Sequence, residues 1–389
     1  MVELYGFSFS LFGLIALGLL LLAFIHQLYF YFRYLNGVLH LRTKIKKNKI
    51  PFITEQPPVS VIICAKDESD NLRKFLPFIL QQDYPDFEVI VINDGSTDDT
   101  ENLLNDLSVE YSNLRTTFVP VGANNVSTKK LGLTLGIKAA KNDLLLFTDA
   151  DCMPEDKCWI ARMVRNFTPE TEFILGYGAY IEKKGLLNKL ITYDTLFIAL
   201  QYLGMAAARK PYMGVGRNLA YRKETFFAQK GFAATLGLSS GDDDLMVNKA
   251  SNSRNTRVEI SSDSITWSEP NATFRGWLYQ KQRHLSVSSY YKGSSKFRLS
   301  LEPITRGLFY LSFIAALVFG GLIIQIAAGV LFLARIIIQL CVINRSSKYF
   351  GGRKYLFTLL LFDIYLPLLS LYILTFKKKS LHGKAARWK

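Results

Sequence analysis

Two aspartates stand one residue apart directly after an apolar segment, in the stretch LLLFTDADCMP at residues 144–154. In an extended chain, Asp149 and Asp151 project to the same side, where their like charges repel each other. A divalent cation between them would relieve that repulsion, and Mg²⁺ and similar ions prefer one or two carboxylates together with substrate phosphate oxygens. The pair therefore predicts a metal site for a diphosphate substrate, in which the metal would neutralise the leaving group.

Further acidic residues follow two other segments that have the composition of buried strands. Asp67 and Glu68 come after VSVIICA (59–65), and Asp94 comes after FEVIVIN (87–93). Aspartate is common in turns and at helix N-caps, so each cluster alone has a plain structural explanation. Three clusters at equivalent places favour one shared crevice, because ligands of parallel sheets bind beyond the carboxyl ends of the strands.

The segments that must position these acids alternate between strand and helix patterns. Apolar, β-branched runs are separated by segments with helical spacing, and this alternation is typical of an α/β fold with a mainly parallel sheet and helical crossovers. The sequence has neither a Walker-type phosphate loop nor a G-x-G-x-x-G after the first strand, so phosphoryl transfer and dinucleotide redox chemistry lack their usual loops. The expected strands are 59–65, 87–93, 116–121 and 143–147, and the expected helices are 71–82, 99–107 and 129–140.

Apolar segments long enough to cross a bilayer lie on both sides of this soluble part. Residues 10–32 form the first, and residues 307–343 are long enough for two spans joined at Gly320-Gly321. A last block, 355–376, is interrupted by Asp363 and Pro367. We therefore predict an N-terminal transmembrane helix with a basic linker (1–50), a soluble domain (51–300) and a C-terminal membrane region with a basic tail (301–389).

The formal net charge is +15, and the basic residues are concentrated beside the apolar segments. Juxtamembrane Lys and Arg mark the cytoplasmic face, so we predict an integral protein of a bacterial-type inner membrane whose soluble domain is cytoplasmic. The same distribution argues against nucleic acid as a partner. The last block leaves a conflict, because a full span at 355–376 would put the basic tail outside, whereas a re-entrant or interfacial segment would keep it inside.

Six stretches occur in an order that resembles one known family. VSVIICAKDESDNL, VINDGSTDDT, FTDADCMP, GVGRNLAYRKE, SGDDDL and QKQRH are similar to the ordered motifs of membrane-bound family 2 glycosyltransferases of the GT-A fold. The resemblance covers about residues 57–295 and the flanking spans. It implies an inverting enzyme that transfers a sugar from a nucleotide diphosphate, usually a UDP-sugar, with Mg²⁺ or Mn²⁺.

The resemblance also implies roles for residues of the donor site. Ala65, Asp67 and Glu68 would lie against the nucleoside, and Asp94 would read the uracil edge. Lys129 would lie near the diphosphate.

Neighbouring Lys130 is the alternative for this contact with the diphosphate. Asp149 and Asp151 would form the D-x-D metal site of the family. Within QKQRH, Gln280 and Arg283 match the family's Q-x-x-R-W, and Arg283 would grip the diphosphate.

Two stretches resemble the catalytic and acceptor-side motifs. SGDDDL (240–245) is similar to the segment that holds the catalytic base, which takes the proton of the acceptor hydroxyl. Matching G-D-D makes Asp243 the base, which we prefer, and matching E-D-x-D-L makes it Asp242. A structural alternative is an Asp-rich helix start, favoured by the helix dipole.

On the acceptor side, the resemblance places Gly216 and Asn218 of GVGRNLAY near the donor sugar. His284 replaces the tryptophan of Q-x-x-R-W, which puts processivity in doubt, and packing or stacking is its expected role. The apolar helical stretch 186–210 and the side chains around QKQRH, including Trp277, would lie in the headgroup region or in the core of the domain.

The function predicted from these features is transfer of a sugar from a UDP-sugar to a lipid-linked or membrane-proximal acceptor, beside membrane lipids. A processive polysaccharide synthase is the first alternative. The second is a catalytically inert scaffold that keeps the fold, although the acids present at every expected position argue against it.

Overall fold

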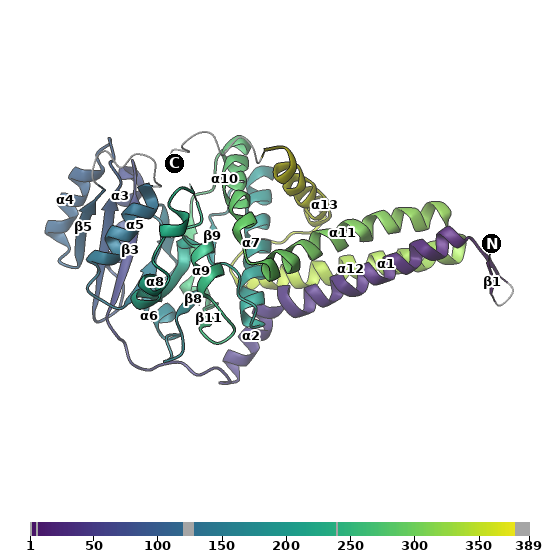
Figure 1. Ribbon diagram of the computed structural model, residues 1–389, viewed down its shortest axis with the longest axis horizontal. Helices are drawn as coiled ribbons and strands as arrows, with labels where there is room; N and C mark the ends of the chain where they lie inside the picture. Colours follow the sequence, from purple (N-terminus) through teal and green to yellow (C-terminus); the bar gives the residue numbers. More distant parts are fainter. Residues whose placement is uncertain (1, 5–6, 120–127, 239, 378–389) are drawn as a thin grey trace.

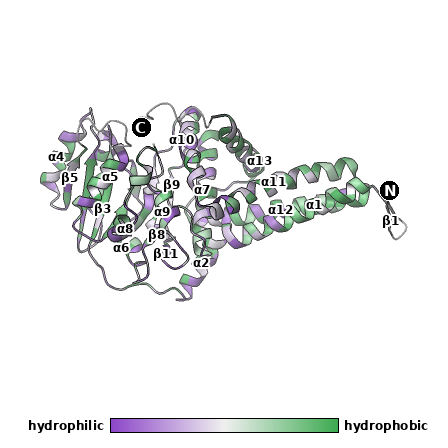
Figure 2. Ribbon diagram, viewed as in Figure 1, coloured by the Kyte–Doolittle hydropathy of each residue, from purple (hydrophilic) through white to green (hydrophobic). Residues whose placement is uncertain are grey.

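The computed structural model describes residues 2–4, 7–119, 128–238 and 240–377 of the chain. An α/β domain forms one end of the molecule, and a long bundle of helices extends away from it (Figure 1). Figure 2 shows the bundle as predominantly hydrophobic, whereas hydrophilic and hydrophobic residues are mixed in the domain. The two parts therefore have the compositions of a membrane region and a soluble domain.

A seven-stranded sheet with the order β11-β8-β10-β6-β3-β4-β5 forms the centre of the domain. Strands β3 to β6 pair in parallel, and β3 is buried along its whole length, as expected for a strand covered on both faces. These pairings confirm the predicted α/β fold. Strand β10 is antiparallel to both of its neighbours, β6 and β8. The strands are β3 (Val59–Ala65), β4 (Phe87–Asn93), β5 (Leu114–Phe118), β6 (Leu144–Phe147), β8 (Phe173–Leu175), β10 (Leu219–Arg222) and β11 (Thr256–Val258).

Helices connect the parallel strands where the apolar spacing predicted them. The expected strand 116–121 ends at Phe118, and its last two positions, 120 and 121, lie outside the described residues. A second sheet of three strands, β7-β12-β9, lies beside the D-x-D segment. These elements are α3 (Ser69–Leu80), α4 (Thr100–Glu110), α5 (Thr128–Ala139), α6 (Trp159–Val164), α8 (Lys223–Ala228), α9 (Asp244–Ala250), β7 (Cys152–Pro154), β9 (Gly178–Tyr180) and β12 (Thr266–Ser268).

Short elements complete the domain and the N-terminal segment. Strands β1 (Val2–Leu4) and β2 (Phe7–Phe9) pair antiparallel before the first long helix. The short 3-10 helices are η2 (Gly216–Asn218), η3 (Ala233–Thr235), η4 (Ser262–Ser264) and η5 (Ser288–Tyr290).

The helical bundle consists of α1 (Leu11–Phe30), α11 (Gly293–Phe319) and α12 (Leu322–Tyr349). The chain breaks at Gly320-Gly321, where the sequence predicts the turn between two spans. Buried apolar side chains fill the space between the three helices, among them Leu20, Phe309 and Ala328. The remaining membrane-side elements are the π-helical turn η1 (Tyr31–Leu35), α2 (Gly37–Lys46), α13 (Phe357–Tyr372) and η6 (Ile373–Lys377).

Among the described residues, five helices are long and apolar enough to cross a membrane, and the chain is therefore a membrane protein. One of the five, α7 (Leu186–Ala207), differs from the rest because 72% of its most apolar stretch is buried inside the protein, compared with 28–33% for the other four. Helix α7 is thus a core helix between the domain and the bundle. The predicted domain boundaries at 50 and 300 lie close to the end of α2 and the start of α11 and stay a prediction.

Close contact between α7 and the N-terminal helices depends on glycine. A Cβ at Gly204 of α7 would overlap the carbonyl oxygen of Tyr34 in η1, and a Cβ at Gly37 of α2 would lie 2.9 Å from the Cα of Gly204. The backbones therefore touch without side chains between them, which is the way small residues bring helices together in membranes.

We expect Gly204→Ala to destabilise the protein, because the added methyl group must push η1 away from α7. Overpacking of this kind costs about 1–3 kcal/mol or more. Thermal unfolding in detergent measures the effect as a lower Tm. The matched control is Gly18→Ala in α1, where a Cβ would have no atom within 4 Å, so its Tm should not fall. Equal Tm values for the two variants would contradict the proposed contact.

Candidate active site

The loops after β3 and β4 are tied to each other at the carboxyl edge of the sheet. The carbonyl of Ala65 accepts the backbone N–H of Asp94 at 2.8 Å. The carboxylate of Asp67 accepts the backbone N–H of Thr97 at 2.7 Å, and the N–H of Asp67 donates to Ser96 at 2.9 Å. Asp67 holds a positive φ of 50°, which is uncommon for a residue other than glycine and is tolerated best by Asp and Asn. These contacts fix the rim on which the predicted nucleoside residues lie.

Asp94 and Glu68 complete this rim. Asp94 is buried and accepts the hydroxyl of Thr128 at 2.6 Å, and burial raises the pKa of its carboxyl. Glu68 accepts the side chain of Asn71 at 2.5 Å, next to the start of α3. The structure therefore places all four predicted nucleoside residues along one edge, and their contacts with a nucleoside stay a prediction.

Lys129, in the first turn of α5, stands between two acidic segments that are far apart in the sequence. Its ammonium lies 3.0 Å from the carboxylate of Asp149 and 3.6 Å from that of Asp242. Burial lowers the pKa of Lys129, but the charges of Asp149 and Asp242 outweigh it, so the pKa is raised and the ammonium stays charged. Lys129 thus connects the D-x-D turn to the SGDDDL segment.

Lys130 makes different contacts from Lys129, and these argue against the contact with a diphosphate that the sequence left open for it. Its buried ammonium donates to the carbonyl oxygens of Thr235, Leu238 and Ser240 at 2.6, 3.0 and 2.8 Å. Because three carbonyls use its three protons, Lys130 fixes the chain leading into Asp242. The geometry therefore favours Lys129 over Lys130 for contact with a diphosphate.

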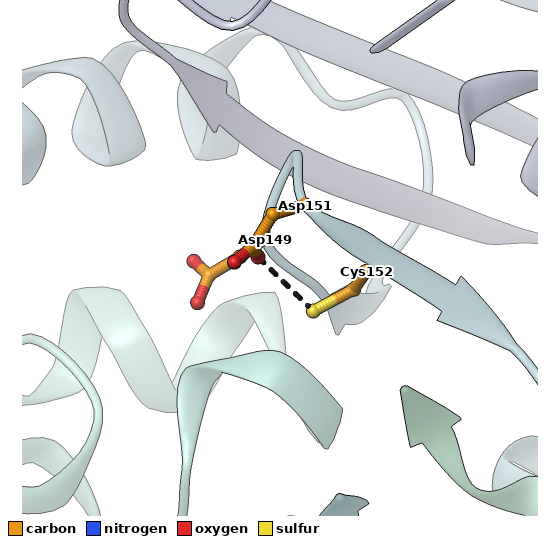
Figure 3. A group of neighbouring side chains, drawn as sticks. All are labelled: Asp149, Asp151 and Cys152. Atoms are coloured by element: carbon orange, nitrogen blue, oxygen red, sulfur yellow. Dashed lines mark hydrogen bonds between the residues drawn. The ribbon is translucent and has the colours of Figure 1, made fainter. Parts of the chain in front are cut away.

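The D-x-D side chains gather at the turn between β6 and β7 (Figure 3). One ligand atom from each of Asp149, Asp151 and Cys152 lies within 4.8 Å of the others, a spacing that fits a metal ion. The thiol of Cys152 donates to Asp151 at 3.5 Å and lies 3.0 Å from the hydroxyl of Ser268. Burial and the two neighbouring carboxylates raise the pKa of this thiol, so it stays protonated and is a poor ligand for a hard cation.

The two carboxylates fit a divalent cation because their charges are unequally compensated. Burial is the largest single effect on the pKa of Asp149 and raises it, but the charge and hydrogen bond of Lys129, together with the charges of Arg217 and Arg283, lower the pKa overall. Burial and the charge of Asp149 raise the pKa of Asp151. A cation beside Asp151 would remove this unfavourable repulsion, and Asp149 and Asp151 are the residues that would hold it.

The SGDDDL segment carries the remaining acids. Asp243 is the N-cap of α9; one oxygen accepts the N–H of Asp244 at 2.7 Å and the other accepts the N–H of Gly216 at 2.6 Å. Burial and the charge of Asp242 raise the pKa of Asp243 to about 6. Asp244 is buried, accepts the hydroxyl of Tyr291 at 2.6 Å, and has a pKa raised to about 8 by burial and by Asp243. Asp243 is therefore the carboxylate whose pKa best suits a general base near neutral pH.

A pocket of about 350 Å³ brings these groups together. Asp149 and Gly216 line it together with apolar residues such as Leu133, Phe147 and Phe232. Its remaining charged lining residues are Lys129, Asp242 and Asp243. The pocket thus joins the D-x-D turn to residues of the GVGRNLAY and SGDDDL stretches.

Residues of the QKQRH motif lie on α10 (Phe274–Val287). Gln280 donates to the hydroxyl of Tyr180 at 2.8 Å and accepts the amide of Asn271 at 2.8 Å, so its amide holds α10 against β9. The buried Nε of Arg283 has no hydrogen-bond partner within the described residues, which leaves it a donor to offer to an anion. His284 is exposed, and the stacking role expected for it stays a prediction.

The structure places Asn218 in a different position from the one near the donor sugar that the resemblance implied. It is fully buried; its amide donates to the carbonyls of Tyr177 and Ser264 and accepts the indole N–H of Trp159. These contacts use the whole side chain within the core, so Asn218 supports the wall of the crevice and does not reach a sugar. Gly216, in contrast, contacts the site directly through its N–H bond to Asp243.

Arg217 is a residue that the sequence analysis missed. Its guanidinium lies 4.2 Å from the ring centre of Tyr180 and donates to the carbonyls of Gly178 and Ala179. Its charge lowers the pKa of both D-x-D carboxyls: less than Lys129 does at Asp149, but more than Lys129 does at Asp151. Its place within GVGRNLAY was the available signal, since arginine beside an acidic site is a common anion contact.

A buried ion pair joins the core helix α7 to α10. The ammonium of Lys281 lies 2.7 Å from both oxygens of Asp194, and the two side chains are 9% and 11% exposed. Lys281 stands between Gln280 and Arg283 on the same helix, so the pair sets how α10 presents these residues.

The fold and the arrangement of the site agree with a glycosyltransferase of the GT-A type. The structure of "Mannosyltransferase PcManGT from Pyrobaculum calidifontis in complex with GDP-Man and Mn2+" superposes with a TM-score of 0.58 at 18% identity, covering 94% of this chain and 99% of that one. At this identity the likeness shows a shared fold. Residues 60–228 match the family model described as "Glycosyl transferase family 2". The chain therefore carries a family 2 glycosyltransferase domain, which confirms the predicted family and class of enzyme.

Curated relatives agree with this family. "Probable glycosyltransferase YdaM" of Bacillus subtilis (strain 168) is 24% identical over 281 residues, which cover 70% of this chain and 65% of that protein. "Poly-beta-1,6-N-acetyl-D-glucosamine synthase" of Staphylococcus epidermidis is 28% identical over 138 residues, covering 35% of this chain and 32% of that protein. The chain thus matches less than two thirds of the length of either relative.

The Asp194–Lys281 pair leads to a prediction about donor binding. Asp194→Asn should leave a buried ammonium without its charge partner, a change that costs about 3–5 kcal/mol when such a pair is broken. We expect α10 to shift and the KM for the donor to rise more than kcat falls. Steady-state kinetics over a range of donor concentrations measures the split.

The double variant Asp194→Lys with Lys281→Asp restores opposite charges and serves as the matched control. It should recover at least part of the donor affinity lost in Asp194→Asn. A uniform loss of kcat in the single variant, with no recovery in the double variant, would show that the pair supports the fold without positioning α10.

Proposed function

We propose that this protein transfers a sugar from a UDP-sugar, with inversion, to a lipid-linked or membrane-proximal acceptor at the cytoplasmic face of a membrane. The single observation that carries this proposal is the joining of the D-x-D turn and the SGDDDL segment by Lys129, which contacts both Asp149 and Asp242. This contact supports the proposal because one-step displacement requires the residues that bind the metal and diphosphate to lie close to the base.

Proton transfer is the part of the reaction assigned to Asp243. In an inverting transfer, the acceptor hydroxyl attacks the anomeric carbon from the face opposite the leaving diphosphate, and its proton must leave as the bond forms. Asp243 receives that proton on its carboxylate, which the N–H groups of Gly216 and Asp244 hold in a fixed direction. Asp242 is the alternative base, and its ion pair with Lys129 makes it the weaker candidate.

Neutralising the negative charge of the leaving diphosphate is the role proposed for the basic side chains. Lys129 and Arg283 are the candidates to bind phosphate oxygens, Lys129 from the pocket and Arg283 through its unpaired Nε. Mg²⁺ or Mn²⁺ held by Asp149 and Asp151 would supply further neutralisation of the leaving group. The structural relative named above was solved with GDP-Man and Mn²⁺, so a guanosine donor is the nucleotide to test against UDP.

The membrane region favours an acceptor that is itself in the membrane. Helix α7 packs the domain directly onto the N-terminal helices, which holds the site near the bilayer. The staphylococcal relative is a polysaccharide synthase, which makes processive synthesis the second candidate. Buried side chains such as Leu20, Ala316 and Ala328 fill the bundle of α1, α11 and α12, which argues against a channel through it.

The first prediction concerns donor and metal. Purified protein in detergent, given UDP-sugars and GDP-sugars with Mn²⁺ and a native lipid extract, should transfer sugar from a UDP-sugar, with the product identified by mass spectrometry. Asp151→Ala should abolish transfer and the metal-dependent part of UDP binding, measured by calorimetry. The matched control is Asp106→Ala on the exposed face of α4, which should keep both. Transfer from GDP-sugars alone, or full activity with a chelator, would contradict this part of the proposal.

The second prediction concerns the base and its pH dependence. A base must be unprotonated, so a pKa of about 6 at Asp243 predicts a rate that falls as the pH drops through about 6. Asp243→Asn should lower kcat about 10²–10⁴-fold, the usual effect of removing a general base, with little change in donor affinity. Rates from pH 5 to 8 and UDP binding measure both effects.

Asp242→Asn is the matched variant on the neighbouring position. If Asp242→Asn is inactive and Asp243→Asn is active, the base is Asp242. If both variants lose UDP binding, these carboxylates serve the donor site instead. Normal turnover by both variants would contradict the mechanism.

A further inference from the structure

The segment from the end of α12 to η6 reverses its direction at the membrane side of the molecule. After Tyr349 the chain turns at Gly351, which has a φ of +75°, and runs back along α12 so that Tyr355 lies beside Asn344. Helix α13 follows, and η6 at its end lies against α10 of the domain. Figure 1 shows α13 lying obliquely between α10 and α11, apart from the long axis of the bundle.

Several backbone groups in the extended part of this segment are paired with α12, and the N–H of Arg353 is accepted by Glu182. Asn344 accepts the N–H of Tyr355 at 2.6 Å and donates to its carbonyl at 3.0 Å. Ser347 donates to the carbonyl of Arg353 at 2.6 Å, and its own carbonyl accepts the N–H of Gly352 at 2.8 Å. Non-helical backbone at the depth of a membrane is tolerated only where the protein itself supplies such partners.

A cluster of charged side chains holds the inner face of α13. Asp363 is fully buried, lies 3.1 Å from Arg306 of α11 and 2.9 Å from Arg335 of α12, and accepts the amide of Gln339 at 2.6 Å. Arg306 also pairs with Glu302 at 2.6 Å. Charged groups within a membrane region are costly unless they are paired and face the protein interior. Asp363 therefore fixes which side of α13 faces the bundle.

The opposite side of α13 is apolar and exposed. Leu361, Ile364, Leu368 and Leu371 are 54%, 42%, 60% and 62% exposed. The helices beside it, α11 and α12, also expose apolar side chains such as Leu311 and Leu333, and Figure 2 shows the same hydrophobic colour on all three. The outer face of α13 thus continues the surface of the bundle that lipid covers.

The polar contacts of α13 on α12 stay near the end of α12 that meets the domain, although residues 357–376 are a candidate span by length and composition. These contacts reach from Gln339 to Arg335, and at 1.5 Å per residue Arg335 lies about 14 Å along the helix from Asn344. The hydrocarbon core of a bilayer is about 30 Å thick. Both ends of the segment contact elements of the domain side, Arg353 through Glu182 and η6 through α10.

We propose that residues 350–377 form a re-entrant membrane segment, which enters lipid as extended chain, returns as α13 and leaves the C-terminal tail on the same side as the α/β domain. Three spans, α1, α11 and α12, then cross the membrane. The basic residues on both flanks of the segment, among them Arg345, Lys348 and Lys377, lie on one side, which removes the conflict with the distribution of positive charge.

Labelling of single cysteines in right-side-out and inverted vesicles tests this topology with the full chain. Cys341 and Cys158 are replaced by Ser as the background, whereas Cys64 and Cys152 are buried and kept. Cysteines at Lys47, at Gly321 in the α11–α12 turn and at Lys389 are then treated with an impermeant maleimide. We expect the probe at 389 to react in the same vesicle orientation as the probe at 47, and in the opposite orientation to the probe at 321. Reaction of 389 together with 321, or in neither orientation, would overturn the proposal.

A second measurement tests whether α13 lies in lipid, and it does not require activity. A bimane fluorophore on Leu368→Cys should be quenched by lipids with brominated acyl chains. The matched control is Val109→Cys on α4, a site 89% exposed on the domain, which should not be quenched. Equal fluorescence of the two labels in brominated lipid would show that α13 lies in water, and the re-entrant segment would be excluded.

Discussion

Repulsion among carboxylates is the constraint on which the rest of the site depends. Asp149 meets Asp242 and Asp243 around one pocket, and the ammonium of Lys129 pairs with both Asp149 and Asp242. The two adjacent lysines have different roles. Lys129 neutralises charge, whereas Lys130 donates to the carbonyls of the loop that positions the SGDDDL segment. Burial and the charge of the neighbouring carboxylate, Asp149 beside Asp151 and Asp242 beside Asp243, raise the pKa values of Asp151 and Asp243, so the compensation is incomplete. A site with more negative than positive charge is suited to a ligand that binds together with a cation.

The membrane helices reach this site through α7. On one side its Gly204 contacts the backbone of η1, and on the other its Asp194 pairs with Lys281 of α10. Tyr193, next to Asp194, packs against Tyr355 and Phe362 of the re-entrant segment. Helix α10, which carries Arg283, is therefore fixed from the membrane side by an ion pair and by η6. The position of α10, and with it this part of the proposed donor site, therefore depends on the membrane region.

Local patterns in the sequence were sufficient for much of this architecture. The three strands that the acids follow, the break at Gly320-Gly321 and the D-x-D turn can all be read from local patterns over a few residues. The antiparallel β10, the internal role of Asn218 and the ion pair of Asp194 with Lys281 could not be predicted, because each depends on partners that only the fold brings together. Helix α7 shows the same limit, since its length and composition match a span and only its neighbours make it a core helix.

The last apolar block, residues 355–376, shows why a buried charge must be judged together with the charges that pair with it. In the sequence, Asp363 interrupts a hydrophobic run and weakens it as a span. In the fold, Asp363 and Glu302 meet Arg306 and Arg335, two acids with two bases, so the cluster is neutral and hidden from lipid. A neutral cluster on one face leaves the other face free to be wholly apolar, which a helix lying partly in a membrane needs. The acid that makes 355–376 a poor span is thus the residue that makes α13 a good re-entrant helix.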